Sequence, residues 1–416
     1  MNQHAAPESI SFDEFEDIRR ALYHPALSRT LDRRSFEEGN PRAGILSLLH
    51  GDVHRQRRRF ENALFRRHSL VEYEQELFPK ILAELLDREA VGAVDLFPLA
   101  GSVTVVLAAR RAGVDHDGSG PELADLFEHV KVIAQAAAIH DIVGDRDKVQ
   151  AEAIAVLDNF DRVYVTPSRR RREALLDAGE DVPYDLLSEA LRILRAGDDT
   201  FADHALLVRE VALFLHGGSH TSAQTVCNVF YFLFGLDGTG PRTEWLRRVA
   251  ASRLHAQKAV HETLRLIPTT PEFKRYAEDD GEVVGCPVHR GTRVALDART
   301  ANRDPELFGE QPDRFDPDRR IRDDVPLWGH SFGAGPHICI GRSVAGGLPL
   351  TGSMLRDGVP ETHLYGLIAL LVQGIAARGV RSDPERAPER DDRTSRGSRW
   401  MRFPVLFPGA AAASAR

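Results

Sequence analysis

The ten residues Phe332 to Gly341, FGAGPHICIG, constrain this chain more than any other stretch. Three glycines and a proline surround Cys339, so the backbone can turn tightly and pass close to a flat ligand. Such a loop can aim backbone N–H groups at the sulfur, and a thiolate held in this way can ligate a metal. Taken without the rest of the string, a glycine-rich turn around a buried cysteine explains the pattern more simply.

The complete string decides between these interpretations. F-G-x-G-x-H-x-C-x-G resembles the haem-binding loop of the cytochrome P-450 family, and every fixed position matches. The resemblance implies that the cofactor is haem b and that Cys339 is the axial ligand of its iron. It also implies that Phe332, Gly333 and Gly341 lie against the haem and that His337 contacts a haem propionate.

Apolar residues recur at helical spacing through most of residues 12 to 275, as in LVEYEQELFPKILAELLD. After Arg265, short β-prone pieces alternate with glycine and proline, and the tail RTSRGSRWMRFPVLF predicts a final strand pair. The chain has no internal repeat and no interdomain linker. We therefore expect residues 1–416 to form a single, mainly α domain. The resemblance implies the cytochrome P-450 fold, with a large helical domain and a small β-sheet part.

Composition limits the class of protein. The formal charge of −8 argues against a nucleic-acid binder, and no segment resembles a signal peptide or a membrane span. We therefore expect a cytoplasmic protein without nucleic-acid or membrane partners. The three cysteines form no CxxC pair and no Cys/His cluster, which argues against structural zinc and a disulfide framework.

Two further motifs resemble the family's buried ion network. HETLR contains an E-x-x-R pair, Glu262 and Arg265, one helical turn apart, and PDRF supplies Arg314 as the expected third member. An isolated E-x-x-R pair is usually solvated, but this one lies upstream of the cysteine loop, as it does in the family. A buried carboxylate is costly unless cations satisfy its oxygens, so a triad is physically reasonable.

Cations that match the family's propionate partners come from several segments. GDVHRQRRRFENALF supplies His54 and Arg58, which are four residues apart and so share one helix face, and PEFKRYAEDD supplies Arg275. With His337 they make four expected contacts to the haem carboxylates. The neighbouring basic residues are expected to form a solvated face: Arg55, Arg57 and Arg59.

The segment HGGSHTS, residues 216–222, interrupts an apolar helical run. His216 and His220 have the spacing of a metal-ligand pair, while each glycine between them costs a helix roughly 1 kcal/mol relative to alanine. No acidic third ligand stands nearby in the sequence, so we do not expect a second metal there.

The family places A/G-G-x-D/E-T-T/S in its long central helix, where a kink makes room for O2 and the acid and alcohol deliver protons. Gly217 and Gly218 match the glycines and Thr221 matches the alcohol, but His220 stands where the acid is expected. Histidine can relay protons near neutral pH. The resemblance therefore implies that Gly218, His220 and Thr221 are catalytic.

The reaction that the resemblance implies is insertion of one oxygen atom of O2 into a C–H bond of a hydrophobic small molecule, by hydroxylation or a related oxidation, in secondary metabolism. NAD(P)H, a ferredoxin and a ferredoxin reductase are the expected electron donors. Because of His220, two alternatives stay open: a modified haem-thiolate enzyme for peroxide-driven oxidation, isomerisation or dehydration, and a non-catalytic haem-binding protein. The expected substrate pocket is lined by Leu213, His216, Gly217, Thr270 and Phe273.

The chain departs from the family pattern in two places. The first departure is at the N-terminus. In the family, several tens of residues come before the helix that SFDEFEDIRRALYHPALSR resembles. The N-terminus is therefore expected to be shorter than usual, which leaves part of the small sheet in doubt. In addition, GGLPLTGSMLRDGVPETH, residues 346–363, breaks the helix expected after Cys339. Proline and paired glycines do not continue a helix cheaply, which predicts an inserted loop.

Overall fold

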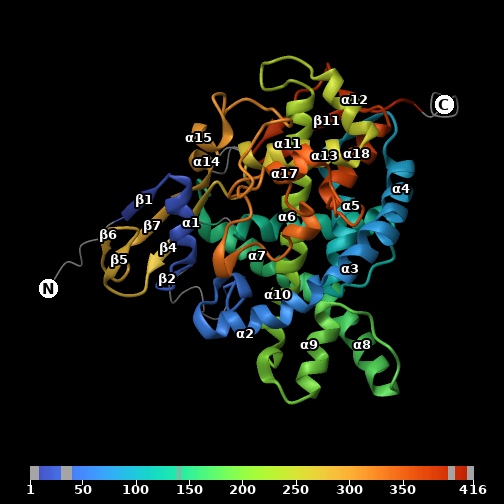
Figure 1. Cartoon of the computed structure of the whole chain (residues 1–416). Coiled ribbons are helices and arrows are strands. Elements are labelled where there is room, and N and C mark those ends of the chain that lie inside the picture. Colours follow the sequence, from blue (N-terminus) through green and yellow to red (C-terminus); the bar gives the residue numbers. More distant parts are fainter. Residues whose placement is uncertain (1–8, 30–39, 138, 140–141, 392–398, 410–416) are drawn as a thin grey trace.

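Helices make up most of the structure, and the main sheet lies along one edge of it (Figure 1). The structure is a computed structural model and describes residues 9–29, 40–137, 139, 142–391 and 399–409. The mainly α fold with a small β part, predicted from the sequence, is confirmed. None of the helices in the described ranges is long and apolar enough to cross a membrane.

The α-helices follow in chain order. The first half contains α1 (Phe15–Tyr23), α2 (Gly51–Asn62), α3 (Arg67–Glu72), α4 (Phe78–Glu89), α5 (Leu96–Ala112), α6 (Gly120–Ala137), α7 (Arg146–Phe160), α8 (Thr166–Ala178) and α9 (Leu186–Arg195). The second half contains α10 (His204–Gly218), α11 (His220–Leu233), α12 (Thr243–Ala251), α13 (Arg253–Leu266), α14 (Ala298–Ala301), α15 (Pro305–Phe308), α16 (Arg342–Ala345), α17 (Gly352–Asp357) and α18 (Leu367–Ala377).

The core is built around α10 and α11, which follow one another through the middle of the molecule (Figure 1). Both helices pack on α5, and α13 packs on α11 and α18. Helices α5 and α18 are buried around most of their circumference, as expected for helices that are apolar on all sides. Side-chain caps fix where α5, α10 and α13 begin, through Asp95, Asp203 and Ser252.

The main sheet has the strand order β1 (Ser9–Phe12), β7 (Arg293–Asp297), β4 (Glu272–Ala277) and β2 (Leu27–Ser28). Strand β1 is parallel to β7, and the other two pairs are antiparallel. The N-terminal segment that left the sheet in doubt therefore supplies two of its strands. Apolar side chains of α1 and β7 form a second core beside it.

Three smaller β units complete the β region. Strands β5 (Gly281–Val283) and β6 (Cys286–Val288) form a hairpin, while β11 (Pro404–Leu406) lies between β3 (Ala93–Asp95) and β8 (Arg381–Ser382). Strand β10 (Trp400–Arg402) pairs with β9 (Glu389–Arg390). The predicted C-terminal strands are thus present, but each pairs with an earlier strand rather than with the other.

The helix that follows Cys339 is short. It is α16, which ends at Ala345. The next residue, Gly346, lies against the rings of Phe332 and Trp328, where a side chain would press on both. The chain then leaves the core, forms α17 and returns at α18. Gly347 and Gly366 meet backbone to backbone at the base, and the Leu348 N–H donates to the Leu364 carbonyl at 2.8 Å. Residues 346–366 thus form a loop with a closed base; that it is an insertion stays a prediction.

Candidate active site

The E-x-x-R pair lies at the centre of a fully buried ion network. The Arg265 guanidinium donates to both oxygens of Glu262, each at 2.7 Å, and its Nη1 donates to the Asn302 carbonyl at 2.7 Å. Asn302 in turn accepts the backbone N–H of His330 at 2.7 Å. The network therefore supports the chain that leads into the cysteine loop.

The third member of this network is Arg319, and the prediction of Arg314 is wrong. Arg319 Nε donates to Glu262 at 3.2 Å, whereas the Arg314 side chain is exposed and donates to Gln311. Phe315 packs inward against Phe232, which turns the side chain of Arg314 outward. Arg314 contributes only its carbonyl oxygen, which accepts from Arg319 at 2.6 Å.

The cysteine loop is held by its backbone. Gly333 and Gly335 have positive φ angles of 69° and 67°, and a side chain on Gly335 would overlap the carbonyl of Leu22. Both positions therefore require glycine. The Cys339 N–H donates to the Phe332 carbonyl at 2.9 Å, which closes the loop.

The Cys339 thiol is exposed to solvent although protein surrounds it. This surrounding protein raises the pKa of the thiol, while the backbone N–H groups of Gly341 and Arg342 and the charge of Arg58 act in the opposite direction. A metal ion bound at the sulfur would lower the pKa of the thiol much further and so favour the thiolate. The loop thus offers a preformed, accessible ligand atom with its hydrogen-bond donors in place.

Arginine and histidine side chains gather beside this thiol from three separate segments. The rings of His54 and His337 lie 4.1 Å apart, and Arg58 Nη2 donates to the Ile338 carbonyl at 2.7 Å. Arg275 on β4 is 4% exposed, and burial lowers its pKa to about 9. Burial, with the positive charges nearby, lowers the pKa of His54 to about 4 and that of His337 to about 2.

Sequence analysis missed one member of this group, Arg29. It follows β2 directly, burial lowers its pKa, and its charge lowers the pKa of Arg275 and of His337. Within the ranges that the structure describes, no carboxylate pairs with Arg29 or Arg275. Buried cations without a counterion are costly, so the cluster fits a ligand that brings carboxylates, as haem does.

The central helix is interrupted at Ser219, one residue after the paired glycines. Ser219 separates α10 from α11, with φ of −105° and ψ of −62°, and its carbonyl accepts a hydrogen bond from Thr104. The Thr221 hydroxyl donates to the Gly217 carbonyl at 2.8 Å. Gly217 is exposed and a side chain there would meet no atom within 4 Å, whereas Gly218 packs against Ala108.

The two histidines of this segment are neighbours, with ring centroids 5.8 Å apart. Burial lowers the pKa of His216 to about 3 and lowers the pKa of His220 well below its usual value. The His220 ring lies edge-on to Phe97 on α5, at 5.7 Å. The residues described here contain no cluster of three or more groups able to hold a metal ion, so nothing completes a site around the pair.

The residues expected to line the substrate pocket come from two regions. Phe273 on β4 lies within van der Waals reach of Gly333, so it adjoins the cysteine loop. Leu213 and His216 are half-buried on α10, and Thr270 is exposed between α13 and β4. The measured contacts therefore join only Phe273 directly to the candidate haem site.

The second feature that sequence analysis missed is a buried charge cluster next to these helices. Arg57, expected on a solvated face, is buried and donates to Glu210 on α10 at 3.0 Å. Burial raises the pKa of Glu210 to about 7 and that of neighbouring Glu61 well above its usual value. The signal available in the sequence was Glu210 itself, a lone acid within the apolar run LVREVALFLH.

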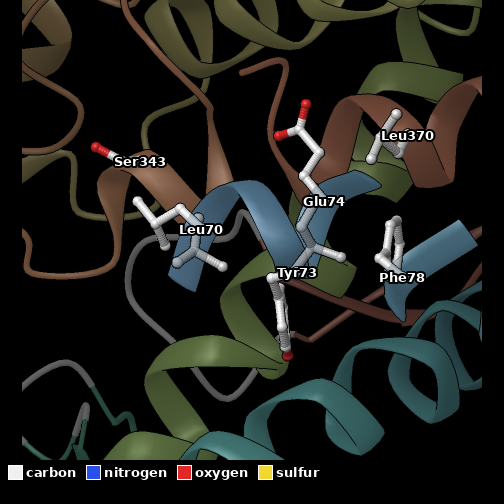
Figure 2. A pocket seen from close by; sticks show the side chains of 8 residues that line it. Leu70, Tyr73, Glu74, Phe78, Ser343 and Leu370 are labelled. Atoms are coloured by element: carbon white, nitrogen blue, oxygen red, sulfur yellow. The ribbon is translucent and has the colours of Figure 1, made fainter. Parts of the chain in front are cut away.

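A small pocket lies behind the cysteine loop, between the α3 segment, α16 and α18 (Figure 2). Its free space is about 10 Å³, room for a single water. Figure 2 shows Glu74 and Tyr73 pointing in opposite directions. The Glu74 carboxylate accepts the N–H groups of Tyr365 and Gly366, both at 2.8 Å, at the start of α18. This pocket is a gap between packed helices and is too small for a substrate.

Comparison with known proteins agrees with this geometry. A cytochrome P-450 family model matches residues 253–346. Cyclooctat-9-en-7-ol 5-monooxygenase of Streptomyces melanosporofaciens is 25% identical over 363 residues, or 79% of this chain and 75% of that protein. Sterol 14alpha-demethylase of Mycolicibacterium vanbaalenii is 45% identical over 92 residues, 21% of this chain and 20% of that one. The crystal structure of CalO2 is similar with a TM-score of 0.72 and 20% identity, covering 97% of this chain and 93% of that one.

These findings define the fold of a haem-thiolate protein. The family-model match, the P450-named relatives and the structural neighbours support a bacterial-type cytochrome P-450. It is accordingly a monooxygenase enzyme with haem b as its cofactor, as predicted from the sequence.

Proposed function

We propose that this enzyme inserts one oxygen atom of O2 into a C–H bond of a hydrophobic small molecule of secondary metabolism. The observation that carries the proposal is the exposed Cys339 sulfur, held by two backbone N–H groups beside buried cations that lack an anion. Haem bound at this cysteine supplies O2 activation, which the thiolate favours by donating electron density to the iron. His54, Arg58, Arg275, His337 and Arg29 would hold its propionates.

Proton delivery is assigned to the interrupted part of the central helix. The Thr221 hydroxyl donates to Gly217 and keeps its own lone pairs available, so it can accept one proton and pass on another. His220 stays neutral near pH 7 because burial lowers its pKa. A neutral imidazole can still relay a proton, by accepting on one ring nitrogen and donating from the other. Gly218 contributes by allowing the close approach of α5.

The substrate is a hydrophobic natural product, by analogy with the relatives. One of them is named for cyclooctat-9-en-7-ol and another for a sterol. We assign Leu213, His216, Gly217, Thr270 and Phe273 to its pocket. Electrons come from NAD(P)H through a ferredoxin and its reductase, docked near Arg342 and the exposed Arg55 and Arg59. The cytoplasmic location expected from the sequence stays a prediction.

A peroxide-driven oxidation is the second candidate, and the environment of His220 favours it. A buried neutral histidine against Phe97 replaces the acid that is expected to recruit protons. An enzyme supplied with peroxide already receives oxygen at the two-electron reduced level and so needs fewer delivered protons.

One experiment separates these candidates. Purified haem-loaded protein is reduced under CO, and a red-shifted Soret band is expected for thiolate ligation by Cys339. Product formation is then compared with NAD(P)H, ferredoxin and reductase in one reaction and with peroxide alone in another. Product from the electron-transfer chain supports the main proposal. Product in the peroxide reaction with none from the electron-transfer chain overturns it. A binding protein without turnover would show the band and give product in neither reaction.

A further inference from the structure

Two buried carboxylates and one guanidinium lie together between α2 and α10. Glu61 of α2 and Glu210 of α10 are 0% exposed, and Arg57 of α2 is 7% exposed. Arg57 Nη1 donates to Glu210 at 3.0 Å, and the Leu46 N–H donates to both oxygens of Glu210 at 3.2 and 3.1 Å. Arg57 therefore balances the charge of Glu210 when that carboxylate is ionised.

Glu61 lacks such partners. Neither of its carboxylate oxygens accepts a hydrogen bond from the part of the chain that the structure describes, and the buried Nε of Arg57 has no acceptor there either. A buried ionised carboxylate without a donor is costly, so the group of two carboxylates and one guanidinium is neutral when it holds one proton. Burial and the charge of Glu210 raise the pKa of Glu61 well above its usual value, and burial raises the pKa of Glu210 to about 7. Because the two carboxylates interact, they titrate as a pair.

Charged groups around this carboxylate pair come from three segments. They are Arg57 and Arg58 of α2, Arg209 of α10, and Asp198, which precedes the 3-10 helix Asp199–Phe201. Uncharged groups also contribute: the Leu46 N–H bonded to Glu210, and the Thr200 carbonyl and Phe201 ring that contact Arg57. Near pH 7 the arginines are protonated and Asp198 is ionised, so Glu61 and Glu210 are the members of this group that titrate there.

Arg58 connects the carboxylate pair to the cysteine loop. It lies one helical turn before Glu61 on α2, so both residues share one face of the helix. Its Nη2 donates at 2.7 Å to the carbonyl of Ile338, the residue directly before Cys339. Burial lowers the pKa of Arg58, while the negative charges of Cys339 and Glu61 act in the opposite direction. Both sites therefore act on one guanidinium, and a charge that forms at one of them changes proton binding at the other.

We infer that Glu61 and Glu210 form a proton-binding site that is coupled to the charge of haem bound at Cys339. The inference rests on the proposed function, because that function supplies the haem and its electron donor. One electron that enters the iron adds one negative charge, and a carboxylate oxygen of the pair then gains an O–H bond to a proton from solvent. Reduction is therefore easier at lower pH, and a carboxylate pair away from the reacting centre sets the pH dependence of the reduction potential.

The test is the reduction potential of the haem-loaded protein, measured spectroelectrochemically at several pH values between about pH 6 and pH 8.5. Across this range the equilibrium constant for reduction of the wild type is expected to fall about threefold to tenfold. In E61Q a neutral amide replaces the carboxyl group and leaves Glu210 paired with Arg57 alone, so this part of the pH dependence should be absent. D52N removes an exposed carboxylate of the same helix and is the matched control, with the wild-type pH dependence. Equal pH dependence in the wild type and E61Q, or none in the wild type, overturns the inference.

A second measurement detects the proton itself. The infrared difference spectrum between the reduced and the oxidised protein should contain a new protonated-carboxyl band in the wild type, which shifts in D2O and is missing from E61Q. E210Q is the second variant, because its amide oxygen can still accept the Leu46 N–H, and it should lack the band too. A band that persists in both variants assigns the proton to another carboxyl group and contradicts the inference. A thiolate CO band together with unchanged pH dependence in E61Q refutes only this inference, whereas absence of the CO band refutes the proposed function.

Discussion

The cysteine loop and the broken central helix are built on opposite principles. In the loop, Gly335 lies against the Leu22 carbonyl, and the Cys339 N–H donates to the Phe332 carbonyl. Asn302 accepts the His330 N–H and so connects the segment before the loop to the ion network. In the central helix, Gly217 faces open space and His220 stands in place of an acid. Close contacts therefore fix the backbone around the proposed ligand Cys339, whereas the segment around Gly217 and His220 has free space beside it.

The largest effect is expected when the loop loses its ligand atom. In Cys339→Ser the cation cluster is unchanged, so haem is still retained, but thiolate donation is removed. We expect the red-shifted CO band to disappear and monooxygenation to fall to background. The check is the ferrous–CO spectrum together with product formation. Retention of both in the variant would show that another residue is the ligand.

The support behind the loop is tested by a matched pair of arginines. Arg319→Ala leaves Glu262 buried with one cation fewer, and breaking such a buried pair costs about 3–5 kcal/mol. Arg314→Ala removes an exposed side chain and should change the free energy of unfolding by less than about 0.5 kcal/mol. Urea unfolding measures both values. If Arg314→Ala lowered the free energy of unfolding more than Arg319→Ala does, Arg314 would be the third member of the ion network.

The central helix is tested by two substitutions at His220. His220→Phe preserves the packing on Phe97 but removes both ring nitrogens, so the proton-dependent rate should fall about a hundredfold. His220→Asp restores an acid and should raise the fraction of NAD(P)H that yields product. Ser222→Ala, which removes a hydroxyl bonded to the Gly218 carbonyl, is the control. If coupling and rate are unchanged in both His220 variants, this residue relays no protons.

A smaller effect concerns pH and the buried His261. Its Nε2–H donates to the Gly346 carbonyl at 2.8 Å, and its ring packs on Trp328. Burial lowers its pKa to about 3, so below the ordinary histidine value the unfolded chain binds the extra proton. Stability from this group is present above about pH 6.5 and is lost as the pH falls toward 3.

Between pH 7 and pH 5 the wild-type protein should therefore lose about 1–2 kcal/mol more stability than His261→Gln. Denaturant titrations at the two pH values give the difference. Parallel losses in both proteins would assign the pH dependence to other groups, such as His330, whose pKa burial lowers to about 4.

The structure could be predicted from the sequence where a motif is local and its backbone conformation is fixed by its own residues. The string around Cys339 predicted the fold through its resemblance to the cytochrome P-450 family, and Gly333 and Gly335 have the positive φ angles that such a loop needs. That Cys339 is the ligand stays a prediction. Arg314 was chosen over Arg319 because spacing alone does not say which arginine of PDRFDPDRR turns inward. That direction depends on Phe315 packing against Phe232, a contact 83 residues apart.

Clusters assembled from distant segments were missed for the same reason. Arg57 meets Glu210 across 153 residues, and nothing near either residue distinguishes Arg57 from the exposed Arg55 and Arg59. Arg29 lies near Arg275 and His337 only because β2 pairs with β4. Long-range pairing of this kind is set by the whole core, so no short sequence window contains it.

The loop of residues 346–366 has a consequence for engineering. Its two ends already touch through Gly347 and Gly366, and Gln257 Nε2 fastens the base by donating to the carbonyls of Gly346, Leu348 and Leu364. Its tip, near exposed Gly358, adds nothing to that closure. Added length there costs little closure entropy, since the cost grows only slowly with chain length. A reductase partner grafted at the tip would therefore be tethered on the cysteine side without moving α16 or α18.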